Sequence, residues 1–512
     1  MYTSILSHID EDYVLRAIDE IKNFGTNEEI EKLIRFVQSD FLATVTHPSF
    51  RAINVDLQLT YILTASVRLS QFSDDTKSLA SALAYYFGKV VDDQSFTIDH
   101  LIHYYDILYG WFWRDAANTS EMACFFNDCV SPFHSRLARE IEPADCVRNL
   151  PDHLSDYRVG ILVNYGHDTM DNGVLPHIDA ILLYLKKVGI EVFVYCTYNY
   201  DQAYFNRVQA LGHTIRTIEF KEEARINRNY DGFASEIKAD RLDVLLGDTA
   251  RGNLGLYFQY RLAPVQVFID YGMPYWMHQQ VDLVCTPGKK WRGDYPFPKK
   301  ITLESKPSQT LTEFRGRHVE ENLNAVADVR KRFPEDAFII GCFTRLSKVT
   351  IEMMSCIETV LLSYPQAYFI LAGTGKADRI NKFFERSAIS DKVLFLQHNV
   401  DLNVYGAAID LFADTFPFVG GNACREVMDK GTPIVSMQSM DWDFLSTDGR
   451  DPALVAEDQE HYVALLMRCI EDEAFLQDCQ KATRSIVEKD VQETVFPSLL
   501  MADIQKRFAN RI

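Results

Sequence analysis

The chain has 512 residues and a formal net charge of −20, and 47% of its residues are hydrophobic and 12% aromatic. This composition excludes intrinsic disorder, and the acidic balance disfavours nucleic acid as a partner, because phosphate backbones would be repelled overall. No apolar run of 18 residues and no secretory leader are found, so we expect no membrane insertion and a cytoplasmic protein of two or three domains.

Residues 1–150 are predicted to form an all-α domain. They hold only three of the 24 glycines and three of the 17 prolines, and apolar residues such as Val14, Leu15, Ile18 and Ile21 recur at helical spacing. The stretch 103–133 is rich in Tyr, Trp and Phe. Most of these rings are expected in the helix core, although some could form a groove for an acceptor peptide.

From about residue 157 the pattern changes to strands that alternate with helices. Four apolar runs predict a first Rossmann-like domain over residues 151–315, and four more predict a second over 316–512 that includes C-terminal helices. The runs are 159–163, 192–195, 244–246 and 265–269, then 338–342, 368–372, 393–396 and 411–412. We expect a linker near 306–321. The predicted fold class is therefore α/β, with two facing Rossmann-like domains after the all-α domain.

A polar loop at 164–172 follows the first predicted strand and precedes a helix that holds His177. Loops at the carboxyl ends of strands often carry function, so Asp171 and His177 are candidates for a catalytic base or for a partner of a sugar hydroxyl. Asp248, after the third strand, is a similar candidate. The alternative for this loop is ordinary turn and capping chemistry.

The segment 261–284 reads RLAPVQVFIDYGMPYWMHQQVDLV and contains His278. A histidine near its unperturbed pKa of about 6.5 could act as a base or, when protonated, stabilise a leaving phosphate. Its alternative is a loop or interface histidine. A basic cluster at 289–300 follows, which we interpret as a solvated loop or as a loop over the cleft.

The segment 341–350, GCFTRLSKVT, runs from a predicted strand into a polar turn that holds Thr344, Arg345 and Lys348. The Lys348 ammonium can act as a point charge against a diphosphate only if the fold brings it opposite Gly421 and Asn422. Otherwise it is a surface charge. Further on, the turn 397–399 holds His398, and its backbone could read the edge of a base.

The segment 407–437 predicts a strand, a turn at Gly420 and Gly421, a helix opened by Asn422, and another strand. A helix N-terminus has unpaired N–H groups and a partial positive charge, which suit a diphosphate. Glu426 lies one turn along the helix and could accept hydrogen bonds from two ribose hydroxyls. Many α/β proteins, however, use such a turn only to pack a helix onto a sheet.

Three of these segments, 261–284, 341–350 and 414–437, resemble in order the GT-B glycosyltransferases of family 41. This family contains the O-GlcNAc transferases and the bacterial cytoplasmic adhesin N-glucosyltransferases. The Phe-Pro-Phe at 416–418 ahead of Asn422 and Glu426 is most similar to the bacterial enzymes. No 34-residue helical repeat precedes the segments, again unlike the O-GlcNAc transferases. Phe418 stands where many GT-B enzymes carry a first glutamate.

The resemblance implies an inverting enzyme that transfers a hexose or N-acetylhexosamine, from UDP-glucose or UDP-GlcNAc, to Asn, Ser or Thr of a protein acceptor. That acceptor would be an adhesin or another surface protein. His278 and His177 are similar to histidines of the family, and together with Asp171 of the polar loop they are the predicted catalytic residues. The implied donor-binding residues are Thr344, Arg345, Lys348, His398, Gly420, Gly421, Asn422, Ala423 and Glu426.

No metal and no other cofactor is expected, because helix amides and a lysine would offset the charge on the leaving UDP. Asp441-Trp442-Asp443 matches the Asp-x-Asp pattern of metal-dependent transferases, but we interpret it as a loop feature. The ten cysteines contain no Cys-x-x-Cys pair and are expected to be free thiols. Two other functions stay open: a UDP-sugar epimerase with a GT-B-like fold, and a non-catalytic glycosyltransferase partner subunit. The aromatic all-α domain favours a macromolecular acceptor.

Overall fold

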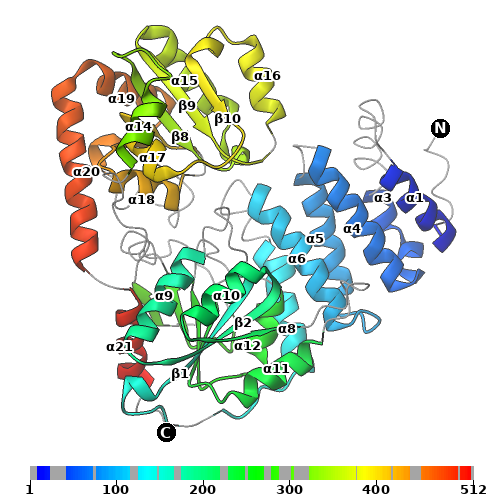
Figure 1. The fold of residues 1–512 in the computed structure, drawn as a ribbon. Coiled ribbons are helices and arrows are strands. Elements are labelled where there is room, and N and C mark those ends of the chain that lie inside the picture. Colours follow the sequence, from blue (N-terminus) through cyan, green and yellow to red (C-terminus); the bar gives the residue numbers. More distant parts are fainter. Residues whose placement is uncertain are drawn as a thin grey trace.

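The structure is a computed structural model, and its parts are arranged as Figure 1 shows. It describes residues 9–23, 42–72, 77–115, 125–146, 149–166, 175–218, 229–247, 252–269, 278–286, 301–304, 322–375, 377–416, 419–438, 451–493 and 496–508. Within these residues, no helix is long and apolar enough to cross a membrane.

The N-terminal part is helical, as predicted. Its elements are α1 (Glu11–Asn23), α3 (Leu42–Thr46), η2 (Pro48–Ala52), α4 (Val55–Phe72), α5 (Lys77–Val90), α6 (Ile98–Asp115), the π-helical turn η3 (Phe126–Val130) and α8 (Ser131–Glu140). The rings of Tyr104, Tyr105 and Phe125 are at most 1% exposed, and Tyr105 packs on Phe133 with ring centroids 5.0 Å apart. These aromatic residues therefore form helix core.

The first Rossmann-like sheet has seven parallel strands in the order β3-β2-β1-β4-β5-β6-β7. The strands are β1 (Arg158–Gly166), β2 (Glu191–Tyr200), β3 (Thr214–Thr217), β4 (Val244–Gly247), β5 (Val265–Ile269), β6 (Leu283–Thr286) and β7 (Ile301–Glu304). Its helices are η4 (Leu154–Asp156), α9 (Leu175–Lys187), α10 (Gln202–Ala210), α11 (Tyr230–Ala239) and α12 (Gly252–Gln259). Every residue of β4 and β5 is buried, because helices cover both faces, and this explains their continuous apolar runs.

The second sheet has six strands in the order β10-β9-β8-β11-β12-β13. They are β8 (Phe338–Phe343), β9 (Ala367–Ala372), β10 (Val393–Leu396), β11 (Leu411–Ala413), β12 (Ile434–Met437) and β13 (Val455–Ala456). The accompanying helices are α14 (Leu323–Arg330), η6 (Leu346–Lys348), α15 (Ile351–Ser363), α16 (Asp378–Arg386), η7 (Ser390–Lys392), α17 (Leu402–Ala408), α18 (Asn422–Asp429), η9 (Pro452–Leu454) and α19 (Gln459–Glu471). All strand pairs of this sheet are parallel.

The helical part and the first sheet share one hydrophobic core. Side chains of α4, α5, α6 and α8 lie in one buried cluster with Leu162, Tyr195 and Phe268 from the sheet and Tyr257 from α12. The predicted division near residue 150 thus lies inside a continuous packed unit.

The C-terminal helices return to the first sheet. The long helix α20 (Glu473–Glu493) runs along one side of the molecule, and α21 (Phe496–Phe508) packs against the first Rossmann-like domain (Figure 1). Leu500, Met501 and Ile504 of α21 are buried in the same cluster as Val159 of β1. The predicted division assigned this helix to the second domain, whereas its core contacts are in the first.

Candidate functional site

The order of the second sheet defines where a ligand should bind. From β8 the chain moves outward to β9 and β10 on one side, and from β11 to β12 and β13 on the other. In open α/β sheets, ligands bind outside the carboxyl ends of the strands at such a switch point. The Lys348 segment follows β8, and the Gly420 turn follows β11, so two predicted segments meet at this point.

Backbone contacts fix the turn that leaves β8. The Thr344 amide donates to the Ala372 carbonyl at 3.0 Å, and the Leu346 amide donates to the Thr374 carbonyl at 2.9 Å. Gly373 permits this approach, because a Cβ there would lie 1.7 Å from the Thr344 oxygen. The position of η6, and with it Lys348, is therefore set by the ends of β8 and β9.

Lys348 reaches across from η6 to the glycine turn. Its Nζ donates to the Val419 carbonyl at 3.3 Å, and the side chain is half-buried. Burial lowers the pKa of the Lys348 ammonium, the charge of Arg345 lowers it further, and Asp414 opposes both. An ammonium has three N–H donors, and Val419 is its one hydrogen-bond acceptor among the described residues, so the group is suited to receive an anion.

A buried carboxylate holds the glycine turn. Asp414 directly follows β11 and is 1% exposed, and its carboxylate accepts hydrogen bonds from the Thr415 amide at 2.9 Å and the Gly420 amide at 2.6 Å. The other carboxylate oxygen accepts from Ser436 Oγ at 3.0 Å. The backbone carbonyl of Asp414 accepts from the Tyr462 hydroxyl at 2.8 Å. Asp414 was not among the predicted site residues, although an acidic residue directly after a buried strand was an available signal.

Helix α18 starts at this turn with an open N-terminus. Its N-cap residue, Gly421, makes no side-chain capping bond, and no acidic residue stands in the first turn. A Cβ on Gly421 would meet nothing within 4 Å, whereas a Cβ on Gly420 would lie 2.5 Å from Cys424 Sγ. Gly421 thus borders open space, and half-buried Glu426 lies one turn further on.

The remaining donor-side candidates lie at the same edge of the sheet. Arg345 is exposed at the start of η6, and His398 is exposed just after β10. Thr350, which caps α15 by accepting from the Met353 amide at 3.2 Å, donates its hydroxyl to the Phe416 carbonyl at 3.2 Å. The second domain therefore gathers its predicted residues around one edge.

His278 is found in a different setting. His278 lies in the segment 278–282 that leads into β6. The Asp282 amide donates to the Gln266 carbonyl at 2.8 Å, so this segment lies where β5 and β6 begin. Arg261 and Gln266 both donate to the Gln280 carbonyl, at 2.8 and 2.9 Å. The Arg-Leu-Ala-Pro-Val-Gln motif of this chain thus holds a loop at the amino edge of the first sheet.

The His278 side chain is packed between the helical part and the first sheet. It is 1% exposed, its Nδ1 accepts from the Gln280 amide at 3.1 Å, and its ring meets that of His134 edge to face at a centroid distance of 4.6 Å. The structure does not bring it to Lys348.

For the other catalytic candidates, the side chains fall outside the part of the chain that the structure describes. His177 is the third residue of α9, but its side chain, Asp171 and Asp248 lie outside the described residues. The same holds for the basic cluster at 289–300, the expected linker at 306–321 and the Asp-x-Asp triplet at 441–443. Their roles stay predictions.

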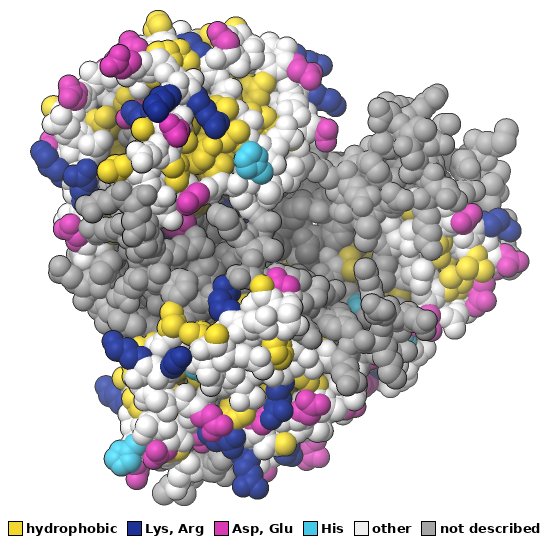
Figure 2. All heavy atoms as spheres, viewed as in Figure 1, with side chains coloured by type: hydrophobic (Ala, Val, Ile, Leu, Met, Phe, Trp, Pro, Cys, Tyr) yellow, Lys and Arg dark blue, Asp and Glu magenta, His cyan; other side chains and the backbone are white. Residues whose placement is uncertain are grey.

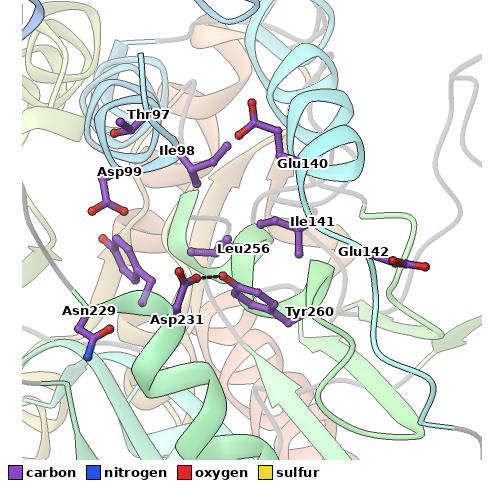
Figure 3. A pocket seen from close by; sticks show the side chains of 11 residues that line it. Thr97, Ile98, Asp99, Glu140, Ile141, Glu142, Asn229, Asp231, Leu256 and Tyr260 are labelled. Atoms are coloured by element: carbon purple, nitrogen blue, oxygen red, sulfur yellow. Dashed lines mark hydrogen bonds between the residues drawn. The ribbon is translucent and has the colours of Figure 1, made fainter. Parts of the chain in front are cut away.

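A cavity of about 660 Å³ lies between α6, α8, α11 and α12, away from the donor-side residues (Figure 3). Its polar lining includes Asp99, Glu140, Glu142 and Asp231, and the Tyr260 hydroxyl donates to Asp231. Burial, and then the Asp231 contact, raise the pKa of the Tyr260 hydroxyl well above its usual value. This cavity belongs to the junction between the helical part and the first sheet, not to the edge that holds Lys348.

Within the described residues, charged side chains of both signs share the surface. On the face drawn in Figure 2, Lys and Arg side chains alternate with Asp and Glu over both Rossmann-like domains. In that part of the chain, no group of three or more His, Cys, Asp or Glu side chains could hold a metal ion, and the nine described cysteines are thiols.

Two parallel Rossmann-like sheets behind a helical region define the GT-B class of fold, as predicted. The O-GlcNAc transferase of Thermobaculum terrenum, in a mutant form, has this architecture and matches with a TM-score of 0.57 over 98% of this chain and 96% of that one, at 16% identity. Anabaena HepE in complex with UDP-glucose matches with a TM-score of 0.49 over 68% of this chain and 99% of that one, at 14% identity.

In sequence, the chain is related to SPINDLY of Eustoma exaltatum subsp. russellianum, a probable UDP-N-acetylglucosamine–peptide N-acetylglucosaminyltransferase. The two are 23% identical over 379 residues, which cover 66% of this chain and 38% of SPINDLY. The chain thus spans well under half the length of that relative. No family model matches the chain. The predicted resemblance to family 41 is confirmed: the chain is a relative of its O-GlcNAc transferases, while the nearer likeness to the adhesin enzymes stays a prediction.

Proposed function

We propose that the chain is a UDP-sugar glycosyltransferase of O-GlcNAc transferase type. It transfers a hexose or N-acetylhexosamine, from UDP-glucose or UDP-GlcNAc, to Asn, Ser or Thr of a protein acceptor. The observation that carries the proposal is the 3.3 Å contact of Lys348 Nζ with the Val419 carbonyl, beside the open N-terminus of α18 at the switch point. The relationship to SPINDLY, whose name states a UDP-GlcNAc-dependent transfer to peptide, supports the choice of reaction.

In this proposal the diphosphate binds between Lys348 and the first amides of α18, from Gly421 to Ala423. Glu426 accepts hydrogen bonds from the ribose hydroxyls, and the turn that holds His398 contacts uracil. As the sugar leaves, negative charge develops on the diphosphate, and preorganised amide and ammonium donors stabilise it. The reaction then needs no bound metal.

The acceptor side is proposed on less support. In sequence, Asp171 falls between β1 and α9, and His177 is the third residue of α9; β1 lies beside β4 at the switch point of the first sheet. One of them would act as the base. His278 would have to become exposed to take part, since it is 1% exposed. Inversion, a surface-protein acceptor and a cytoplasmic location are parts of the proposal that rest on the resemblance alone.

The donor site is tested by UDP binding to the Lys348→Ala variant in a calorimeter. Losing the cation that faces a buried diphosphate typically costs about 2–5 kcal/mol, so we expect at least about 30-fold weaker binding. Lys392→Ala is the matched control, because Lys392 Nζ also donates to backbone carbonyls of this domain, at 2.7 and 2.9 Å. Wild-type affinity in Lys348→Ala would remove this site assignment.

The reaction is tested by UDP release from UDP-glucose and UDP-GlcNAc in EDTA, with and without Asn-x-Thr and Ser/Thr peptides. Peptide-dependent release is the expected result and identifies both donor and acceptor. Interconversion of sugar epimers without any acceptor would replace the transferase by an epimerase. UDP binding without turnover of any donor would indicate a partner subunit.

A further inference from the structure

The Asp414 carboxylate is buried directly beneath the glycine turn. Burying a carboxylate is costly unless its oxygens are hydrogen-bonded, and among the described residues the amides of Thr415 and Gly420 and the hydroxyl of Ser436 donate to it, all within 3.0 Å. Two of these donors belong to the segment that leads into α18. The conformation of that segment is therefore coupled to the presence of the carboxylate.

The same carboxylate acts on Lys348. Burial and then the Arg345 charge lower the pKa of the Lys348 ammonium, and Asp414, followed by the thiols of Cys424 and Cys342, opposes them. The contact also runs through the backbone: Asp414 holds the Gly420 amide, and the preceding carbonyl, of Val419, accepts from Lys348 Nζ. One buried acid thus touches the turn and supports the lysine that crosses to it.

We propose that Asp414 is a positioning residue of the donor site, whose carboxylate fixes the 419–421 turn and stabilises the charged form of Lys348. Because it is 1% exposed, it acts through these neighbours and not by touching the ligand. The inference rests on the proposed function, in which Lys348 and the α18 amides bind one diphosphate.

The test is the Asp414→Asn variant. Its amide oxygen still accepts from the Gly420 amide, while the charge is lost. We expect UDP to bind about tenfold more weakly at pH 8, since about 1.4 kcal/mol corresponds to a tenfold change. The alkaline limb of the binding profile, where Lys348 loses its proton, should move to lower pH. In the Lys348→Arg variant, residue 348 keeps its proton throughout this pH range. Any alkaline loss of binding that this variant still shows therefore comes from UDP itself.

Asp410→Asn is the matched control at the other end of β11. Asp410 accepts from the Ile339 amide at 2.8 Å and from Arg330 Nη2 at 2.6 Å, so its loss should also lower the melting temperature. It should leave UDP affinity and the alkaline limb unchanged.

Wild-type affinity and an unmoved limb in Asp414→Asn would overturn the inference, although the proposed function would stand. Failure of the wild-type chain to bind UDP would instead overturn both. If Asp414→Asn does not fold, Tyr462→Phe tests positioning by itself, because it removes only the hydroxyl that holds the Asp414 carbonyl. We expect about threefold weaker UDP binding with the limb in place; unchanged affinity would overturn the positioning role.

Discussion

The first six strands of the two Rossmann-like sheets have the same order, yet two buried polar side chains, Asp414 of the second domain and Gln266 of the first, lie at opposite edges. In the second sheet, Asp414 and Lys348 meet at the carboxyl edge, around a helix N-terminus that is open to a ligand. In the first, Gln266 and Asp282 are at the amino edge, where they hold the loop between β5 and β6. Sheets of one topology thus differ in which side chains are buried at each edge, and in the first domain buried Asn253 and Thr197 also meet near the carboxyl edge.

The sheets also differ in what covers them. The first shares a core with the helical part, and Leu245 and Phe268 pack in the same cluster as Phe133 of α8. The second is enclosed by its own helices, with Val360 of α15 and Leu466 of α19 in one of its clusters. We infer that the first sheet is a scaffold joined to the helical part, whereas the second has a core of its own.

The largest expected effect tests how rigid the donor edge is. In Gly373→Ala the new Cβ would lie 1.7 Å from the Thr344 carbonyl oxygen, which is backbone and cannot move aside. In Gly160→Ala of the first sheet, the nearest atom is the flexible Leu242 Cδ1 at 2.4 Å. We expect losses of about 4 and about 1–2 kcal/mol in the free energy of unfolding, measured with urea. Equal losses would contradict the contrast.

A smaller effect is expected at the amino edge of the first sheet. Gln266 is fully buried and joins the Leu262 amide to the carbonyls of Phe258 and Gln280 at 2.9–3.0 Å. Gln266→Ala leaves these groups unsatisfied and should cost about 3 kcal/mol in unfolding free energy. UDP affinity, measured on the folded fraction, should stay at the wild-type value. A loss of affinity would mean that this edge does reach the donor site.

The exposed Gln202 provides the control, because its Nε2 donates to Asn206 Oδ1 at 2.8 Å on the surface of α10. Gln202→Ala should change the unfolding free energy by less than about 0.5 kcal/mol. A similar cost for both glutamines would show that burial is not the cause.

Much of the second domain could be predicted from the sequence. The runs 338–342 and 368–372 are buried on both faces, so their apolar character is continuous and marks β8 and β9 directly. Lys348 was predicted to bind phosphate only if the fold brings it opposite Gly421. The two segments follow β8 and β11, which are parallel neighbours, so both lie at the same edge of the sheet. Asp414 was not recognised, because an acidic residue before a turn is usually a local cap.

The edge on which His278 lies could not be predicted, because β6 has only four residues and was not recognised as a strand. Without that strand, nothing in the sequence says that the histidine precedes β6. The common core of the helical part and the first sheet was also missed, since an apolar helix face does not reveal whether a helix or a sheet covers it.

The smallest expected effect separates stability from binding at Lys348. Burial lowers the pKa of this ammonium, so the folded chain releases the proton at a lower pH than the unfolded chain, whose lysine titrates near about 10.4. Between those two pKa values the unfolded chain binds more protons than the folded chain. The contribution of Lys348 to the free energy of unfolding of the wild type therefore rises with pH. Lys348→Met removes the cost of burying the charge and should be about 1 kcal/mol more stable at pH 7.

That advantage of Lys348→Met should shrink as pH rises through the depressed pKa of Lys348 towards about 10.4, because the wild type then buries a neutral amine. Saturating UDP should reverse the ranking at pH 7: ligand at 100 times its Kd stabilises the wild type by about 2.7 kcal/mol, while the variant gains little. Thermal unfolding of both proteins at several pH values, with and without UDP, measures each term. A variant that is less stable than wild type without ligand would show that Lys348 supports the fold, and the donor edge would then resemble the amino edge of the first sheet.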